Sequence, residues 1–246
     1  KECLLTNCDV RHPLHKAWKV ARQGITWYAG RIPQDLRDVI YISGTQLRAM
    51  KPYLHPDTNL HYVPNPITIP AISPVKAVDS DIYLFIGRLN PEKGGLMFAE
   101  AAEQAGVKAV FVGDGPERKA IEKVNPDARI TGWLPSEDVQ KWIQKARCLV
   151  FPSLWYETFG LVAYDALALG IPTICGIWNA ASEAVIHDKN GLIYNNPTLE
   201  ELKQCLVALT EDKHTVFTNN EACNIPTGRK HLEILLNTYE HLMQVN

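Results

Sequence analysis

The sequence has 246 residues, of which 46% are hydrophobic and 21% are charged, the ordinary balance of a globular protein. A formal net charge of −2 argues against a chain that binds nucleic acid through its overall charge. A local basic patch that contacts a membrane surface remains compatible with this charge. No apolar run approaches the roughly 20 residues of a membrane-spanning helix, so we expect no transmembrane segment.

Residues 1–67 contain few predicted elements. Residue patterns there predict a strand at 38–43, a short helix at 45–54 and a second strand at 60–63. Because this is too little for an independent α/β domain, we expect residues 1–67 to be the C-terminal part of an incomplete one. The sequence starts at Lys1 without the apolar core of a signal peptide, so we expect a fragment boundary there, with a processed N-terminus as the alternative. His12 and His15 are assigned no role.

Residues 68–225 alternate apolar runs, glycine turns and amphipathic helices. The runs predict buried strands at 83–87, 107–112, 129–131, 148–151, 172–175 and 192–194. This alternation predicts an α/β fold, a doubly wound parallel sheet with helices on both faces. The last helix, 229–243, lies in a separate segment, 226–246. We expect this segment to pack back towards the N-terminal piece, because its apolar face needs a partner.

Capping residues locate the helices between these strands. Ser136 is expected at the N-cap of one helix, and Thr198 with Glu201 forms a capping-box pattern before another. Pro116 suits the first position of a third helix. The segment 159–169 is predicted to be helical, and the glycine and proline that follow it end that helix. The six cysteines show no C-x-x-C pair and no zinc spacing, so we expect buried or incidental thiols in a reducing cytoplasm.

Cations and glycines follow the first strand of this domain, at the strand end where doubly wound sheets bind ligands. The loop contains Gly87, the two cations Arg88 and Lys93, and a glycine pair, Gly94 and Gly95. The glycine pair would let the backbone approach an anion, and the cations suit a diphosphate. A glycine turn with solvated charges explains the same residues.

Two further strand-to-helix turns contain glycine. Residues 113–116 lack the third glycine of a dinucleotide fingerprint and fit a tight turn or a wall beside a ligand. In the other turn, backbone groups around Gly132 suit the edge of a base, with Trp133 or Leu134 against its face. Core packing of Trp133 is the alternative.

An acidic residue follows the strand at 148–151. We expect Glu157 to project over the strand ends, near the cationic loop, and Asp165 to lie eight positions later on the next helix. Eight residues rise roughly 12 Å, so the two carboxylates suit the two ends of a long ligand rather than a close acid–base pair. Alternatively, Glu157 complements a helix dipole and Asp165 is solvated.

Five segments together resemble glycosyltransferase family 4, a retaining family with the two-domain GT-B fold. They are YLFIGRLNPEKGG, VFVGDGPER, ITGWLP, FPSLWYETFGLVAYDALALGIP and NGLIY, and their order and spacing match as well. The resemblance covers residues 38–245 and is strongest over 83–195. It implies that 68–225 is the nucleotide-sugar-binding domain and that 1–67 comes from the acceptor-side domain.

The resemblance also implies roles for single residues. Arg88 and Lys93 would bind the donor diphosphate, and Glu157 would hold the sugar; these three are the implied catalytic residues. Asp165 would contact the ribose, although the family usually has glutamate there. The other implied donor contacts are Gly87, Gly132, Trp133, Leu134, Thr158, Phe159, Gly160 and Leu161.

The implied reaction transfers a sugar, with retention, from a nucleoside diphosphate sugar to a hydroxyl of a saccharide or lipid-linked acceptor. Because two cations would neutralise the leaving group, we expect no metal and no cofactor beyond this donor substrate. A cytoplasmic enzyme is expected. A nucleotide-sugar-binding module without transfer activity is the main alternative, and a related epimerase is a weaker one. The base, the sugar and the acceptor stay open.

Overall fold

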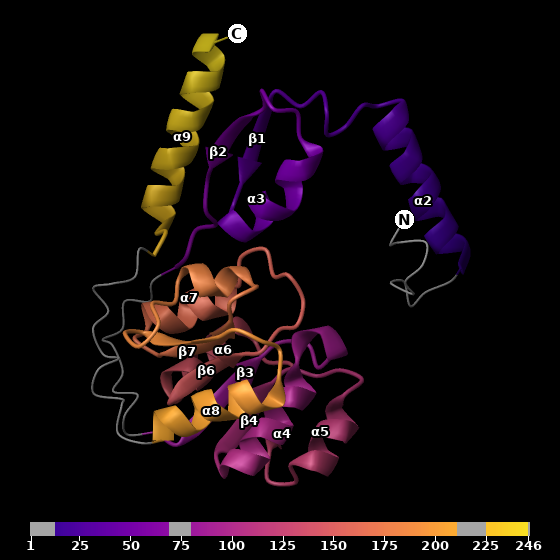
Figure 1. The fold of residues 1–246 in the computed structure, drawn as a ribbon. Coiled ribbons are helices and arrows are strands. Elements are labelled where there is room, and N and C mark those ends of the chain that lie inside the picture. Colours follow the sequence, from indigo (N-terminus) through magenta and orange to yellow (C-terminus); the bar gives the residue numbers. More distant parts are fainter. Residues whose placement is uncertain (1–12, 69–79, 211–224, 246) are drawn as a thin grey trace. The chain divides into compact units, whose positions relative to one another are not determined.

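The computed structural model describes residues 13–68, 80–210 and 225–245 (Figure 1). The chain divides into two compact units, one made of Lys1–Tyr41 and Leu47–Tyr62 and the other of Ile42–Gln46 and Val63–Asn246. The predicted domain boundaries after residues 67 and 225 stay predictions. His12 and three of the six cysteines, Cys3, Cys8 and Cys223, lie outside the described residues.

The first unit contains a two-stranded parallel sheet. Strand β1 (Asp38–Tyr41) pairs with β2 (Asn59–Tyr62), and between them the chain forms α3 (Gly44–Met50) and the short 3-10 helix η1 (Lys51–Tyr53). The predicted strand–helix–strand order is therefore confirmed. No sequence pattern above predicts α2 (Pro13–Tyr28), the helix that precedes these elements.

The second unit contains a six-stranded sheet in which every pairing is parallel. Its strand order is β5-β4-β3-β6-β7-β8. The strands are β3 (Ile82–Ile86), β4 (Lys108–Val112), β5 (Arg129–Ile130), β6 (Cys148–Phe151), β7 (Thr173–Gly176) and β8 (Gly191–Tyr194). All six predicted strands are present, and the predicted doubly wound α/β fold is confirmed. The order of strands reverses between β3 and β6, so this is the point where a doubly wound sheet binds ligands.

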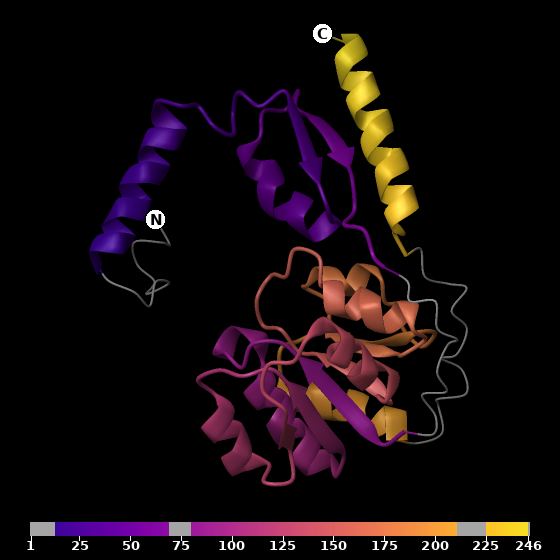
Figure 2. The same ribbon diagram turned by 180° about the vertical axis from the view of Figure 1, so that it is seen from behind.

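Helices cover both faces of this sheet, as the two views show (Figures 1 and 2). Alternate residues of β3 serve opposite faces, since Tyr83 and Phe85 belong to one buried cluster and Leu84 to another. The first cluster is completed by α4 (Gly95–Ala105), α5 (Arg118–Val124) and α8 (Leu199–Thr210), the second by α6 (Ser136–Gln144) and α7 (Leu161–Ala168). Burial on both faces explains why the strands are continuous apolar runs.

Two helix starts differ from their predictions. Helix α6 begins at Ser136 itself, and Pro135 takes the N-cap position without a side-chain hydrogen bond, so the predicted serine cap is wrong. The reason is that the extended Pro135 supplies the carbonyl that accepts the first N–H groups of the helix. Pro116 lies in a turn before α5 rather than at its first position. The reason is that the turn extends through Pro116 and Glu117, so the helix begins only at Arg118.

Helix α7 is shorter than predicted, and the start of α8 is as expected. Gly160 has a left-handed φ of 79° and forms the N-cap, so α7 begins at Leu161 rather than at Phe159. Before α8, the backbone N–H of Glu201 donates to the Thr198 hydroxyl at 3.3 Å, which confirms that part of the capping pattern.

The described chain ends in α9 (Gly228–Val245), two residues longer at its end than the predicted helix. Its start is tied to the segment that enters the second unit, because the Ile67 N–H donates to the Pro226 carbonyl at 2.8 Å and a His231 ring nitrogen lies 2.7 Å from the Pro64 carbonyl. The expected packing of this helix on the N-terminal piece stays a prediction.

None of the helices in the described ranges is long and apolar enough to cross a bilayer.

Candidate functional site

Two loops meet where the strand order reverses. One follows β3 and contains the 3-10 helix η3 (Pro91–Lys93), and the other follows β6 and leads into α7. They approach closely because Gly94 has a left-handed φ of 70°, and a Cβ there would lie 2.2 Å from the Pro152 carbonyl oxygen. Gly94 therefore accommodates the neighbouring loop, and its expected role in the approach of backbone to an anion stays a prediction.

This loop contact gives a stability prediction. We expect Gly94→Ala to lose about 1–2 kcal/mol from the left-handed backbone and about 1–3 kcal/mol more from the clash. Gly106→Ala is the matched control, since Gly106 has a φ of 65° and nothing within 4 Å of the added Cβ. Chemical denaturation measures the free energy of unfolding of both variants. If the two variants lose the same free energy, the clash with the Pro152 carbonyl is relieved without cost.

A cleft of about 600 Å³ opens between these loops. Of the residues implied by resemblance, it is lined by Gly87, Arg88, Lys93, Trp133, Glu157, Thr158, Phe159, Gly160 and Leu161. It also contains three polar residues that the sequence analysis did not single out, Asn65, Glu92 and Ser153. The structure therefore brings together most of the predicted site from segments far apart in the sequence.

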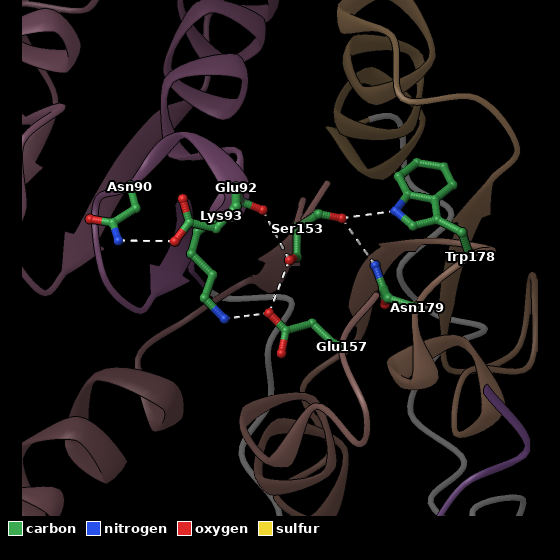
Figure 3. A network of polar contacts seen from close by, with 7 residues as sticks. All are labelled: Asn90, Glu92, Lys93, Ser153, Glu157, Trp178 and Asn179. Atoms are coloured by element: carbon green, nitrogen blue, oxygen red, sulfur yellow. Dashed lines mark hydrogen bonds and ion pairs between the residues drawn. The ribbon is translucent and has the colours of Figure 1, made fainter. Parts of the chain in front are cut away.

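Lys93 and Glu157 form an ion pair across the cleft between the two loops (Figure 3). Both are largely shielded, with side-chain exposures of 35% and 19%. The prediction that Glu157 projects over the strand ends near the cationic loop is thus confirmed. Partial burial makes such a pair stronger than one on the open surface, so an anion that binds Lys93 has to compete with Glu157.

Arg88 provides a second positive charge in the cleft. Within the described part of the chain, its guanidinium forms no ion pair or hydrogen bond. Glu92 lies on the same loop, and the pKa of its carboxyl is lowered, first by a hydrogen bond from Asn90. An available guanidinium beside Lys93 suits an anion with two negative groups, such as a diphosphate.

The start of α7 supplies backbone donors to the cleft. The N–H groups of Thr158, Phe159, Gly160 and Leu161 have no acceptor among the described residues, and all four residues line the cleft. The Phe159 side chain itself is buried and stacks on Tyr164 at 4.5 Å, so only its backbone is available to a ligand. Unpaired N–H groups at a helix start favour phosphate or hydroxyl oxygens.

The three residues expected beside a base lie in different surroundings. Trp133 is 66% exposed and lines the cleft, so core packing, the alternative for this residue, is excluded. Leu134 packs against the second core cluster, and the Gly132 carbonyl accepts a bond from the Gly113 N–H at 2.9 Å. Of the three, only Trp133 borders the cleft.

The glycine turn at 113–116 packs against the loop after β3. A Cβ on Gly113 would lie 1.9 Å from the Gly87 carbonyl, and one on Gly115 would lie 2.5 Å from the Leu89 carbonyl. None of the four turn residues lines the cleft. This geometry agrees with the tight-turn interpretation rather than with a wall beside a ligand.

Asp165 lies on α7, outside the set of residues that line the cleft. Burial raises the pKa of its carboxyl above the usual value. Within the described ranges it has no hydrogen-bond or ion-pair partner. A half-buried carboxylate without a partner is unfavourable, and a hydrogen bond from a ligand hydroxyl would relieve it.

No group of three or more His, Cys, Asp or Glu residues in the described ranges is placed to hold a metal ion. Of the six cysteines, Cys148, Cys175 and Cys205 are described, and all three are free thiols. Burial raises the pKa of Cys205 to about 11. These thiols are therefore protonated at neutral pH and are poor nucleophiles there.

Sequence comparison places residues 80–212 within the model of one family, described as glycosyl transferases group 1. The GDP-mannose-dependent alpha-mannosyltransferase of Corynebacterium glutamicum is 32% identical over 127 residues, which are 52% of this chain and 30% of that protein. The putative teichuronic acid biosynthesis glycosyltransferase of Bacillus subtilis is 37% identical over 100 residues, which are 40% of this chain and 25% of that protein. The chain thus spans less than a third of the length of either relative.

Solved structures share the fold at low sequence identity. Anabaena HepE, in complex with UDP and glucose, superposes with a TM-score of 0.74 at 20% identity, over 96% of this chain and 70% of that one. Sucrose-phosphate synthase from Thermosynechococcus elongatus gives a TM-score of 0.74 at 18% identity, over 94% and 72%. At these identities the likeness shows the arrangement of the chain and not its substrate.

Proposed function

Since this chain belongs to the family of glycosyl transferases group 1, we propose that its cleft binds a nucleoside diphosphate sugar for transfer of the sugar to an acceptor hydroxyl. The observation that carries the proposal is the meeting of Lys93 and Glu157 above the strand ends, where the strand order reverses. A cation for the phosphates and a carboxylate for the sugar then lie side by side, as the two halves of a donor require.

The remaining cleft residues give the donor a direction. The diphosphate would face Arg88, Lys93 and the unpaired N–H groups before α7, and the sugar would face Glu157. The exposed Trp133 offers a flat apolar surface to the base. Asp165, on α7 outside the lining of the cleft, is proposed for the ribose, from whose hydroxyls its carboxylate would accept hydrogen bonds. In this arrangement the sugar of the donor lies at the loop after β6, which carries Glu157, and the base lies at Trp133, in the turn after β5.

Transfer requires stabilisation of two opposite charges. The departing diphosphate becomes more negative, and Arg88, Lys93 and the start of α7 are arranged to oppose that charge. The sugar develops positive charge at its anomeric carbon, and the Glu157 carboxylate would face it. We propose retention of configuration and a reaction without metal, because these cations would take over the work of a divalent ion.

A saccharide or lipid-linked acceptor is proposed, and so is action in the cytoplasm. A relative named for GDP-mannose and a structural neighbour bound to UDP and glucose favour a hexose donor. The alternative function, donor binding without transfer, is distinguished by turnover: a binding module would hold the donor and release no nucleoside diphosphate. An epimerase would also form no glycoside product.

Thermal unfolding with a ligand panel tests the proposal. GDP, UDP, GDP-mannose and UDP-glucose are compared with inorganic phosphate, and at least one nucleotide should raise the melting temperature. A ligand at 100 times its Kd stabilises the native state by about 2.7 kcal/mol, which is easily seen in such an experiment. If none of a broad set of nucleotides shifts the transition, the cleft is not a nucleoside diphosphate site.

Asp165→Asn tests the ribose assignment through opposite effects on affinity and stability. The pKa of Asp165 is raised in the folded state, so its ionisation costs stability as the pH rises past its unfolded pKa, and this cost is present at pH 7. The asparagine variant should therefore melt slightly higher at pH 7. It should nevertheless bind the nucleoside diphosphate about ten-fold more weakly, because a hydrogen bond to a charged group is lost.

Calorimetry and thermal unfolding at pH 7 check both effects on the same protein. The gain in melting temperature should shrink at low pH, where the wild-type carboxyl is protonated. Unchanged nucleotide affinity would remove Asp165 from the donor site, even if the stability effect is found.

A further inference from the structure

Ser153 lies directly behind the Lys93–Glu157 pair. Its hydroxyl is 3.0 Å from Glu157 Oε1 and 3.2 Å from the Glu92 carbonyl oxygen (Figure 3). The residue is 2% exposed, so water does not compete for this hydroxyl. Both neighbours are acceptors, and a hydroxyl has a single proton, so at any moment Ser153 donates to one of them.

The Glu92 carbonyl does not depend on Ser153. It also accepts the backbone N–H groups of Leu154 at 2.9 Å and Trp155 at 3.2 Å. The Ser153 proton can therefore turn to Glu157 without leaving a buried carbonyl unsatisfied. Glu157, in contrast, has only two donors to its side chain among the described residues, Lys93 and Ser153.

The position of Ser153 is fixed from its other side. Its carbonyl accepts a bond from Trp178 Nε1 at 3.0 Å and one from Asn179 Nδ2 at 3.3 Å (Figure 3). Asn179 is fully buried at the start of the 3-10 helix η4 (Ala180–Glu183), and Trp178 packs edge-on against Tyr194. The serine backbone is thus held between the loops after β6 and β7.

We propose that Ser153 is the positioning residue that holds Glu157 in place when Lys93 leaves it for the donor diphosphate. This assignment rests on the proposed function, in which Lys93 binds phosphate and Glu157 faces the sugar. Bound donor draws the Lys93 ammonium away from Glu157 Oε1. The Ser153 hydroxyl then becomes the donor to that oxygen, and the carboxylate keeps its orientation towards the sugar.

A double-mutant cycle in the full-length protein tests the proposal. Release of nucleoside diphosphate from UDP-glucose or GDP-mannose is followed for wild type, Ser153→Ala, Glu157→Ala and the double variant. Loss of one hydrogen bond to a charged group should lower kcat about ten-fold in Ser153→Ala, with the affinity for free UDP or GDP unchanged. In the Glu157→Ala background the serine has nothing to hold, so its removal should change kcat by less than about two-fold.

Ser80→Ala is the matched control. The Ser80 hydroxyl also donates to a backbone carbonyl, that of Lys145 at 2.5 Å, but beside the N-terminal end of β3 and away from the cleft. This variant should keep wild-type turnover. The retained affinity of Ser153→Ala for UDP or GDP shows that its cleft is folded.

The outcomes separate this inference from the proposed function. If Glu157→Ala keeps wild-type turnover, the role of Glu157 is wrong, and the assignment of Ser153 is lost with it. If Glu157→Ala loses turnover and Ser153→Ala does not, only the assignment of Ser153 is wrong. A ten-fold effect of Ser153→Ala in both backgrounds, or a loss of nucleotide affinity, would show a structural role for Ser153 that is independent of Glu157.

Discussion

Glu157→Gln should lower turnover by about 100- to 1000-fold, the usual effect of removing one well-placed electrostatic group from an active site. The glutamine keeps the size of the side chain and can still accept a bond from Ser153, so the loop should stay folded. It lacks the negative charge that faces the developing positive charge on the sugar. Because this charge appears only as the bond breaks, the loss should be found mainly in kcat.

The same variant should bind free UDP or GDP at least as tightly as wild type. In the free protein Glu157 pairs with Lys93, and a diphosphate has to displace it. Glutamine competes less for the ammonium and does not repel the phosphates. Steady-state kinetics and calorimetry measure the two effects, with Glu103→Gln on the exposed face of α4 as the control. Near-normal turnover would remove Glu157 from the reaction, and weaker UDP or GDP binding would contradict the competition.

Lys93→Ala should weaken binding of UDP or GDP by about ten-fold or more, since a charge-assisted contact to phosphate contributes about 1.5–3 kcal/mol. The effect on turnover should be larger, towards about 100-fold, because the leaving diphosphate becomes more negative in the transition state. Glu157 keeps the Ser153 hydroxyl as a donor in this variant, so its orientation should be retained.

Lys108→Ala is the control for Lys93→Ala. Lys108 starts β4, at the opposite end of the strands, and pairs with Asp81 at a distance of 3.6 Å. Its removal should leave calorimetric affinity and turnover unchanged. An unchanged Kd for UDP and GDP in Lys93→Ala would exclude the residue from the phosphate site. If Kd changes and kcat does not, Lys93 binds the ground state only.

Local patterns were sufficient to predict the sheet and the loops of the site. Continuous apolar runs mark strands that are buried on both faces, and each is followed by a turn and a helix with its own residue signals. A chain of such units has few ways to fold, because crossovers between parallel strands are right-handed. Arg88, Lys93 and Glu157 could therefore be placed at the same edge of the sheet before any contact was known.

Contacts made through space could not be predicted in the same way. The Lys93–Glu157 pair joins residues 64 positions apart, and it depends on β3 and β6 being neighbours. Ser153 gives no local signal, since a serine after a proline is common in loops; its role depends on acceptors that reach it from two directions. Helix α2 was missed because its residues contain Gly24 and no acidic first turn, which are poor helix signals.

The pairing of β3 with β6 also bears on how the protein folds. Strands β3 to β5 and strands β6 to β8 are each joined to their neighbours along the chain, whereas Tyr83 has to find Cys148 across a long intervening segment. Contacts of such long sequence separation form late, since loop closure has to precede them. The cleft lies at the boundary between β3 and β6, whose pairing forms late in folding. It therefore does not exist in either half of the sheet alone. A ligand bound there joins the two halves, and it should slow their separation more than the fraying of either sheet edge.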